Sequence, residues 1–462
     1  MKKEKNTTGL ISKSEKNLAL YCIDAALRHG AGQVRVSLSK STLDTFGMLN
    51  GELDKVTHAA DRSIFLYIFA DNRYGTFSTN MLEEASLEQF TAQAVEAVRM
   101  LAEDRHRRLP DPERTEKGAV TGQELGLYDE AYGDLGSDEK SRIAAEECIW
   151  GRAGLPDGLR IISEECEYSD SVDDNFLADS SGFRGRHTET SFAICSEITI
   201  EDTDGKKYSG YWWDSSPCLS GLQRGQCSRI ALGKAVKQVR PLGHEGGSFT
   251  MVVDRSVSSR LVSPLFSALN TASIQQESSF LKNSLGKKIF CGGLSITDAA
   301  RTCGKPGARL FDTEGVATKD MDIIVEGTVK TYFTNTYMAL KTGMEATVEG
   351  VSRPVLLPYS KDGRLPDDGV FDAGKIIQAA GSGIYVTGFN GGNCNSTTGN
   401  FSYGIEGFAF KDGKITHPVR EMVITGNMIS LWNNLAYAGN DARACTRWQI
   451  PSLCFSNVDF SA

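Results

Sequence analysis

Histidine is scarce in this sequence. There are six histidines among 462 residues, and no two of them lie three to five residues apart. Motifs such as H-E-x-x-H place two imidazoles one helical turn apart, so no single helix of this chain can carry a zinc site of that kind. The pair His244-Glu245 is half of the motif, but glycines surround it and favour a turn.

Other motifs of common enzyme classes are also missing. The sequence has no G-x-x-x-x-G-K-[ST] phosphate loop and no G-x-S-x-G nucleophile elbow. The glycines of "GSGIYVTG" come before a predicted strand rather than between a strand and a helix, which argues against dinucleotide binding. The eleven cysteines are scattered and form no C-x-x-C, a pattern typical of reduced, buried thiols in a cytoplasmic protein.

An excess of positive charge and long apolar runs are absent as well. The chain has 50 Lys and Arg against 59 Asp and Glu, with a net charge of −9, which opposes the binding of nucleic acid. No segment approaches the roughly 18 consecutive apolar residues of a membrane helix. No apolar run follows the basic start, so a secretory signal is not expected either. We expect a cytoplasmic protein that binds neither membranes nor nucleic acid.

The element pattern predicts an α+β fold. Residues 12–30 form a helix with an S-x-x-E capping box, and Asn50-Gly51 predicts a hairpin between two strands. Strands and a second helix over 86–103 complete an N-terminal α/β domain with a mostly antiparallel sheet. One helical stretch and then many short strands with glycine-rich turns follow, and they predict a β-rich C-terminal domain. We place the two domains at residues 1–240 and 241–462.

Local chemistry alone offers two candidate sites. In an extended segment Asp312 and Glu314 would share one side, where two carboxylates can bind a cation or transfer protons, although a surface turn is the more common role. Cys394 lies in the loop "GGNCNSTTGNFS" and has no neighbouring histidine to activate it. These residues do not by themselves define a function.

Five stretches of the sequence, read in order, provide more evidence about function. They are "SSFLKNSLGKKI" (278–289), "FDTEGVATKD" (311–320), "VKTYFTNTYMALKTG" (329–343), "NSTTGNFSYGIEGFAFKDGKITHPVREMVITGN" (395–427) and the ending "IPSLCFSNVDF". Together they resemble the TldD/PmbA family, whose members are also called modulators of DNA gyrase. The N-terminal helix–hairpin–helix layout fits the same family, so the resemblance covers nearly the whole chain.

The resemblance also implies a branch of the family. TldD-like members resemble zinc peptidases that carry H-E-x-x-x-H on a helix of the second domain, and the equivalent helix here falls within 254–270. The His, Glu and His positions of the motif correspond to Ser263, Pro264 and Ala268, which cannot bind zinc or accept a proton. The chain therefore resembles the TldE (PmbA) branch, which lacks the metal motif and pairs with a TldD-like subunit.

What the resemblance implies is a non-catalytic subunit of a TldD/TldE zinc metallopeptidase that cleaves unfolded or leader-type peptides. Such a subunit is inactive alone, carries no catalytic residue and no metal, and leaves the zinc to its TldD-like partner. In isolation it would form a homodimer. We expect the loop after 390 to border a cavity shared with the partner, or to be a plain hairpin. The candidate residues of this peptide-binding cavity are Asp312, Glu314, Asn395, Thr398, Phe401 and Ser402.

Two alternatives stay open. The first is an independent metallopeptidase whose ligands converge from distant positions, chosen from His244, His417, Asp312, Glu314 and Cys394. The second is a binding protein that acts on gyrase or another target and turns over no peptide. Cys394 itself could be a vestigial ligand, but a free thiol is favoured.

Overall fold

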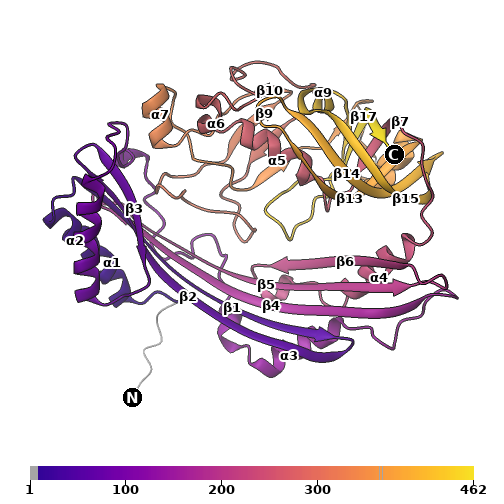
Figure 1. Ribbon diagram of the computed structural model, residues 1–462, viewed down its shortest axis with the longest axis horizontal. Helices are drawn as coiled ribbons and strands as arrows, with labels where there is room; N and C mark the ends of the chain where they lie inside the picture. Colours follow the sequence, from indigo (N-terminus) through magenta and orange to yellow (C-terminus); the bar gives the residue numbers. More distant parts are fainter. Residues whose placement is uncertain (1–8, 364, 367) are drawn as a thin grey trace. The chain divides into compact units, whose positions relative to one another are not determined.

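The chain forms two compact units in a computed structural model that describes residues 9–363, 365–366 and 368–462 (Figure 1). Unit 1 comprises Met1–Val236 and Arg301–Thr318, and unit 2 comprises Lys237–Ala300 and Lys319–Ala462. The segment 301–318 therefore interrupts unit 2 in the sequence and belongs to unit 1. None of the helices in the described part of the chain is long and apolar enough to span a lipid bilayer.

Unit 1 is built on a six-stranded sheet. Its strands are β1 (Gln33–Leu49), β2 (Glu52–Ala70), β3 (Arg73–Thr79), β4 (Arg160–Asp179), β5 (Arg184–Glu201) and β6 (Lys207–Ser216). Their order is β3-β2-β1-β4-β5-β6, and every neighbouring pair is antiparallel. The predicted hairpin is confirmed, because Asn50 and Gly51 adopt φ of 52° and 84° in the turn between β1 and β2.

Helices cover one face of this sheet. They are α1 (Lys13–Arg28), α2 (Glu84–Arg99), α3 (Ser137–Glu147) and α4 (Cys227–Lys237), with short 3₁₀ turns at Pro112–Arg114, Glu130–Asp134 and Leu219–Gly221. The predicted capping box of α1 is present, with Ser12 and Glu15 each accepting the other's backbone N–H. Val36 and Leu38 of β1 pack under α1 and α2, and Phe46, further along the same face, packs in the core beneath α3. The predicted mixed α+β fold with antiparallel sheets is confirmed.

Unit 2 contains two sheets. Its strands are β7 (Gly247–Val253), β8 (Ile296–Asp298), β9 (Met321–Val325), β10 (Thr328–Val329), β11 (Pro354–Leu356), β12 (Tyr359–Ser360), β13 (Gly383–Cys394), β14 (Asn400–Lys411), β15 (Lys414–Asn427), β16 (Leu435–Ala438) and β17 (Leu453–Ser461). The larger sheet has the order β12-β16-β17-β15-β14-β13-β7, and β7 also pairs with β17. The strands β17, β15, β14, β13 and β7 therefore close into a ring, which leaves none of these five as a free edge of that ring.

The C-terminal half was expected to hold one helical stretch, but the described part of unit 2 has five helices. They are α5 (Ser259–Ala268), α6 (Thr271–Gln275), α7 (Thr336–Thr342), α8 (Ala373–Ala380) and α9 (Met428–Asn433). Four of them begin at an Asn or Asp whose side chain accepts a backbone N–H of the first turn. Helices this short contain too few turns for a clear apolar periodicity, which is why the sequence pattern did not reveal them.

Candidate functional site

Helix α5 is the element on which a metal motif was sought. It follows β7 closely and buries Leu261, Leu265 and Phe266 in unit 2. Ser263 is exposed and Ala268 is buried, while Pro264 lies inside the helix. No residue of α5 carries an imidazole, a carboxylate or a thiol. The helix therefore offers no ligand set for zinc and no general base, and a zinc ion does not fit here.

The first turn of α5 contacts the hairpin that β13 and β14 form. The Arg260 guanidinium donates through Nη2 to the carbonyl oxygen of Gly392 (3.1 Å) and lies over the Tyr403 ring, 5.3 Å from its centroid. Gly392 has φ of 75°, and a Cβ at this position would lie 2.0 Å from the Ser402 carbonyl oxygen. Only glycine therefore allows the two strands to approach closely where Arg260 binds.

The loop at the tip of this hairpin links β13 to β14, as the sequence predicted. Asn395 Oδ1 accepts the N–H groups of Thr397 (2.9 Å) and Thr398 (3.0 Å), and its own N–H donates to the Asn400 carbonyl (2.8 Å). Asn427 Nδ2 donates to the Thr398 carbonyl (2.8 Å). Asn395 and Thr398 are exposed, but the amide of Asn395 already fixes the turn, so its structural role is established by its contacts.

Aromatic side chains stiffen the base of the loop. Phe401 is buried and stacks on Tyr403 with ring centroids 5.5 Å apart, whereas its neighbour Ser402 is exposed. Burial raises the pKa of Tyr403 to about 12, with Cys394 adding to the rise and Arg260 opposing it. Burial also raises the pKa of the Cys394 thiol. A thiol that resists ionisation is a poor nucleophile and a poor metal ligand, which fits a free cysteine.

Asp312 and Glu314 lie in unit 1, in a tight turn. Asp312 Oδ1 accepts the N–H groups of Glu314 (2.9 Å) and Val316 (3.0 Å), and Gly315 follows with φ of 84°. Both carboxylate residues are buried. The turn joins the rest of unit 1 where the Glu116 N–H donates to the Gly315 carbonyl (3.0 Å). The contacts of Asp312 are those of a residue that shapes a turn.

His244 and His417, named above as possible distant ligands, do come together in unit 2. Their rings stack with centroids 6.2 Å apart. Within the described residues, however, neither belongs to a group of three potential ligands whose donor atoms lie within 4.8 Å of one another. Asp312 and Glu314 are in the other unit. Within the described part of unit 2, His244, His417 and Cys394 are thus not assembled into a metal centre.

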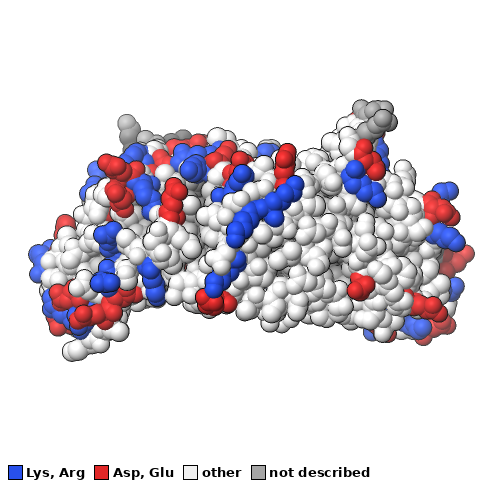
Figure 2. All heavy atoms as spheres, turned by 90° about the horizontal axis from the view of Figure 1, so that it is seen from above, with Lys and Arg blue, Asp and Glu red and all other residues white. Residues whose placement is uncertain are grey.

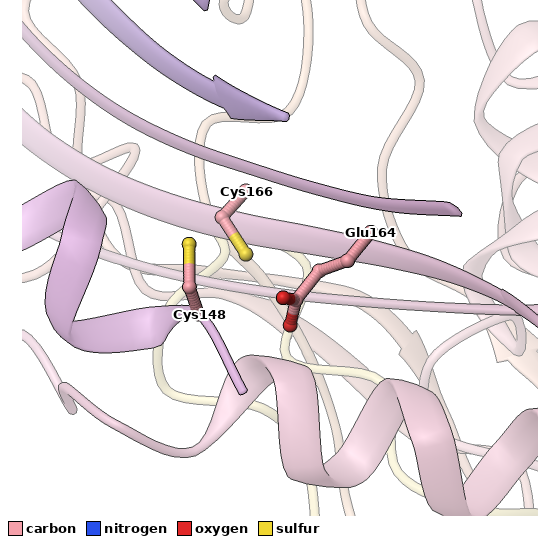
Figure 3. Close-up of side chains that lie close together, drawn as sticks. All are labelled: Cys148, Glu164 and Cys166. Carbon is pink, nitrogen blue, oxygen red and sulfur yellow. The ribbon is translucent and has the colours of Figure 1, made fainter. Parts of the chain in front are cut away.

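One group of three potential ligands does occur in the part of the chain that is described, and it lies in unit 1. Figure 3 shows the sulfur atoms of Cys148, at the end of α3, and Cys166, on β4, turned toward each other beside the carboxylate of Glu164. The donor atoms lie within 4.8 Å of one another, and all three side chains are buried. A divalent cation that prefers sulfur could find two thiolates and a carboxylate here.

The present contacts of these groups are structural. Glu164 accepts the N–H groups of Ile149 (2.8 Å) and Trp150 (2.7 Å), one on each carboxylate oxygen, and so holds the chain leaving α3. A hydrogen bond between the two thiols raises the pKa of Cys148, and burial raises it further, while the same bond lowers the pKa of Cys166. We therefore assign this cluster to the joint between α3 and β4.

Sequence reasoning did not find this cluster or Arg260. The only local signal was the spacing of Glu164 and Cys166, which places both on one face of a strand. Cys148 is far from both in sequence, and nothing in its neighbourhood indicates the contact. Nothing near Arg260 in the sequence indicates its contact either, because that contact forms only where the β13–β14 hairpin approaches α5.

The chain matches two family models. Residues 246–462 match the PmbA/TldA metallopeptidase C-terminal domain, and residues 34–98 match the PmbA/TldA metallopeptidase domain 1. Among curated proteins it is 24% identical over 452 residues to the metalloprotease PmbA of Escherichia coli O157:H7, covering 95% of each chain. It is 23% identical over 472 residues to the PmbA homologue of Haemophilus influenzae, covering both in full.

Solved structures are also similar to this chain over most of its length. A protein of Bacteroides thetaiotaomicron described as a candidate modulator of DNA gyrase is 38% identical and superposes with a TM-score of 0.91, covering 98% of this chain and 100% of that one. TldE of Thermococcus kodakarensis shares the fold with a TM-score of 0.78 and 16% identity, covering 96% of this chain and 100% of that one.

Proposed function

Because the chain belongs to the PmbA/TldD metallopeptidase family, we propose that it is the non-catalytic, TldE-like subunit of a two-subunit zinc peptidase. The observation that carries this proposal is α5, no residue of which has an imidazole, a carboxylate or a thiol. By the family resemblance, Ser263, Pro264 and Ala268 stand where a TldD-like chain would carry its ligands and base. The zinc and the catalytic Glu would then come from a TldD-like partner. The similarity to TldE supports the same branch.

In this proposal the β13–β14 hairpin borders the cavity in which the complex holds its peptide. The side chain of Ser402 is exposed and is available to a bound peptide, whereas the backbone of β14 is already paired with β13 and β15 on its two sides. Asn395, Thr398 and Phe401 would act by holding the loop in shape. Asp312 and Glu314 remain candidates of the same kind, acting through the turn that Asp312 holds.

Charge and cysteine chemistry support the rest of the proposal. On the face drawn in Figure 2, Lys and Arg groups form one short stripe near the middle and are elsewhere mixed with Asp and Glu groups, with much uncharged surface between them. All eleven cysteines are free thiols, which fits a reducing compartment such as the cytoplasm.

Native mass spectrometry of the untagged protein, enriched gently from its own cells, tests the subunit assignment. We expect a mass equal to this chain plus a TldD-like chain, with one zinc ion in the assembly. A chain or homodimer that carries one zinc per protomer and cleaves peptides alone would overturn the proposal and favour the independent metallopeptidase.

The cavity role needs a separate test with the reconstituted pair. We expect Asn395→Ala, Thr398→Ala and Phe401→Ala to lower peptide turnover by about tenfold or more, because loop displacement of even 1 Å is costly to catalysis. Ser396→Ala is the matched control, since this exposed loop residue uses only its backbone carbonyl, toward the Phe280 N–H (2.9 Å). Unchanged turnover in all three variants would remove the loop from the site while leaving the subunit assignment intact.

A further inference from the structure

Strand β2 has a free edge in unit 1. It pairs with β1 along its length, but β3 pairs only with the stretch from Ile64 to Ala70. Within the described residues, the stretch from Glu52 to Ser63 has no strand on its second side. Strands usually have five or six residues, so this open stretch alone is about twice an ordinary strand in length. Such an edge is a template for pairing with another chain.

The same stretch is poorly covered on both faces. Nearly all residues from Glu52 to Arg62 are exposed, whichever way their side chains point. Leu53 and Val56 are 51% and 57% exposed, and Leu43 on the adjoining part of β1 is 43% exposed. Large apolar side chains on one open edge favour a protein surface as their partner.

The charges on this edge of β2 are complementary to those on the same edge of a second copy. If a second copy pairs antiparallel with His58 opposite His58, Lys55 faces Asp61 of the second copy. The twofold axis repeats this pair, which gives two attractive cross-strand contacts. Asp54 lies at a β-bulge, where the register of β2 against β1 shifts, and is not counted among these contacts. Val56 then faces Ala60, so apolar side chains also meet.

Neighbouring registers lack this match. A slip of one residue in one direction places Lys55 opposite Ala60 and loses the ion pair, and a slip in the other places Lys55 opposite Arg62. Like charges directly opposite each other on paired strands are destabilising. The charge pattern therefore favours this register over both one-residue slips.

The backbone is compatible with that register. Ala70 and Arg73 close the two-residue turn between β2 and β3, so the N–H and C=O groups of Ala70 point toward β3. Because this direction alternates along a strand, the even-numbered residues from Val56 to Arg62 direct theirs to the free edge. His58 opposite His58 and Val56 opposite Ala60 pair such residues with each other. Each His58 ring also keeps a carboxylate beside it, since its Nδ1 contacts Asp44 of the same chain.

We propose that two copies of this chain pair through the β2 edge, residues 52–63, as antiparallel strands with His58 on the twofold axis. The six-stranded sheets of unit 1 in the two copies then join into one continuous sheet across the dimer. This edge does not involve α5 or the β13–β14 hairpin, so the inference is independent of the peptidase proposal.

Sedimentation equilibrium of the full chain with charge-reversal variants tests the pairing. Lys55→Asp and Asp61→Lys each create two like-charge contacts, and we expect each to weaken self-association by tenfold or more. An equimolar mixture of the two variants restores opposite charges at both contacts, so its association should return to within about threefold of the wild type. Lys13→Asp and Asp204→Lys change exposed charges elsewhere in unit 1 and serve as matched controls.

A backbone variant supplies a second measurement. Ala60→Pro removes an N–H that points to the free edge, which an edge strand tolerates, so circular dichroism should be unchanged while self-association is lost. The proposal is overturned if the wild type stays monomeric at tens of micromolar. It is also overturned if the single variants associate like the wild type, or if their mixture fails to recover. If the variants still self-associate like the wild type but no longer bind the TldD-like partner, the edge would be assigned to that partner instead.

Discussion

At the scale of single residues, Asp312 shows how a carboxylate that looks catalytic in sequence can serve the backbone. Its Oδ1 accepts two N–H groups in a buried turn. We expect Asp312→Ala to lower the free energy of unfolding by about 1–3 kcal/mol, because two buried donors lose their acceptor. Asp312→Asn keeps a side-chain oxygen at the same place and should cost less than half as much. Urea denaturation of both variants measures this difference.

The same pair of variants separates structure from chemistry. If Asp312 transferred protons or bound a cation, Asp312→Asn would keep the stability of the wild type and abolish peptide turnover by the reconstituted pair. Turnover that follows stability in both variants would confine Asp312 to the turn.

At the scale of elements, one buried lysine connects α3 to the sheet. Lys140 Nζ lies 2.8 Å from Asp170 Oδ1 and also contacts Asp44, and its side chain is only 5% exposed. Burial alone would lower the pKa of Lys140, but its bonds to Asp170 and Asp44 raise it overall. Burial raises the pKa of Asp170, against the opposing effect of Lys140. The lysine therefore makes the buried Asp170 carboxylate tolerable beneath the helix and also pairs with the half-buried Asp44.

We expect Lys140→Met to destabilise unit 1 by about 3 kcal/mol at pH 7, since it leaves both carboxylates without their cation. The folded-state pKa of Asp170, already raised by burial, would rise further above the unfolded value, and the pKa of Asp44 would lose the lowering that Lys140 provides. The folded state would then take up more protons than the unfolded state, so the loss should shrink as pH falls from 7 to 5. Thermal unfolding at both pH values measures this, with Arg142→Met on the exposed face of α3 as control. A loss that does not depend on pH would contradict the electrostatic account.

At the scale of the whole molecule, the segment 301–318 returns to unit 1, where an ion pair adds to the backbone hydrogen bonds that hold it. Arg301 contacts the Glu116 carboxylate and donates to the carbonyls of Thr318 (2.7 Å) and Leu310 (3.2 Å). Burial acts to raise the pKa of Glu116, but the Gly118 N–H and Arg301 outweigh it and leave that pKa lowered. A lowered folded-state pKa means that the carboxylate contributes stability at neutral pH and loses it in acid.

We expect Glu116→Gln to cost about 1–2 kcal/mol at pH 7 and to speed amide hydrogen exchange across 310–318, because a charge-assisted contact is lost. The difference from the wild type should shrink as the pH falls through the lowered folded-state pKa of Glu116, where the wild-type carboxylate itself becomes protonated. Glu113→Gln, an exposed neighbour, is the control. Equal exchange in both variants at pH 7 would show that other contacts hold the segment.

The sequence by itself determined the features that depend on neighbours along the chain. The Ser12–Glu15 cap, the Asn50-Gly51 turn and the loss of metal ligands on α5 follow from residues within a few positions of one another, where backbone geometry leaves few choices. Only the tertiary structure decided which distant residues meet. It placed 301–318 in unit 1 and paired β7 with β17. It also brought the free thiols of Cys148 and Cys166 close together and placed Arg260 against Gly392. These contacts depend on how distant segments pack and pair in space, so they leave no local pattern in the sequence.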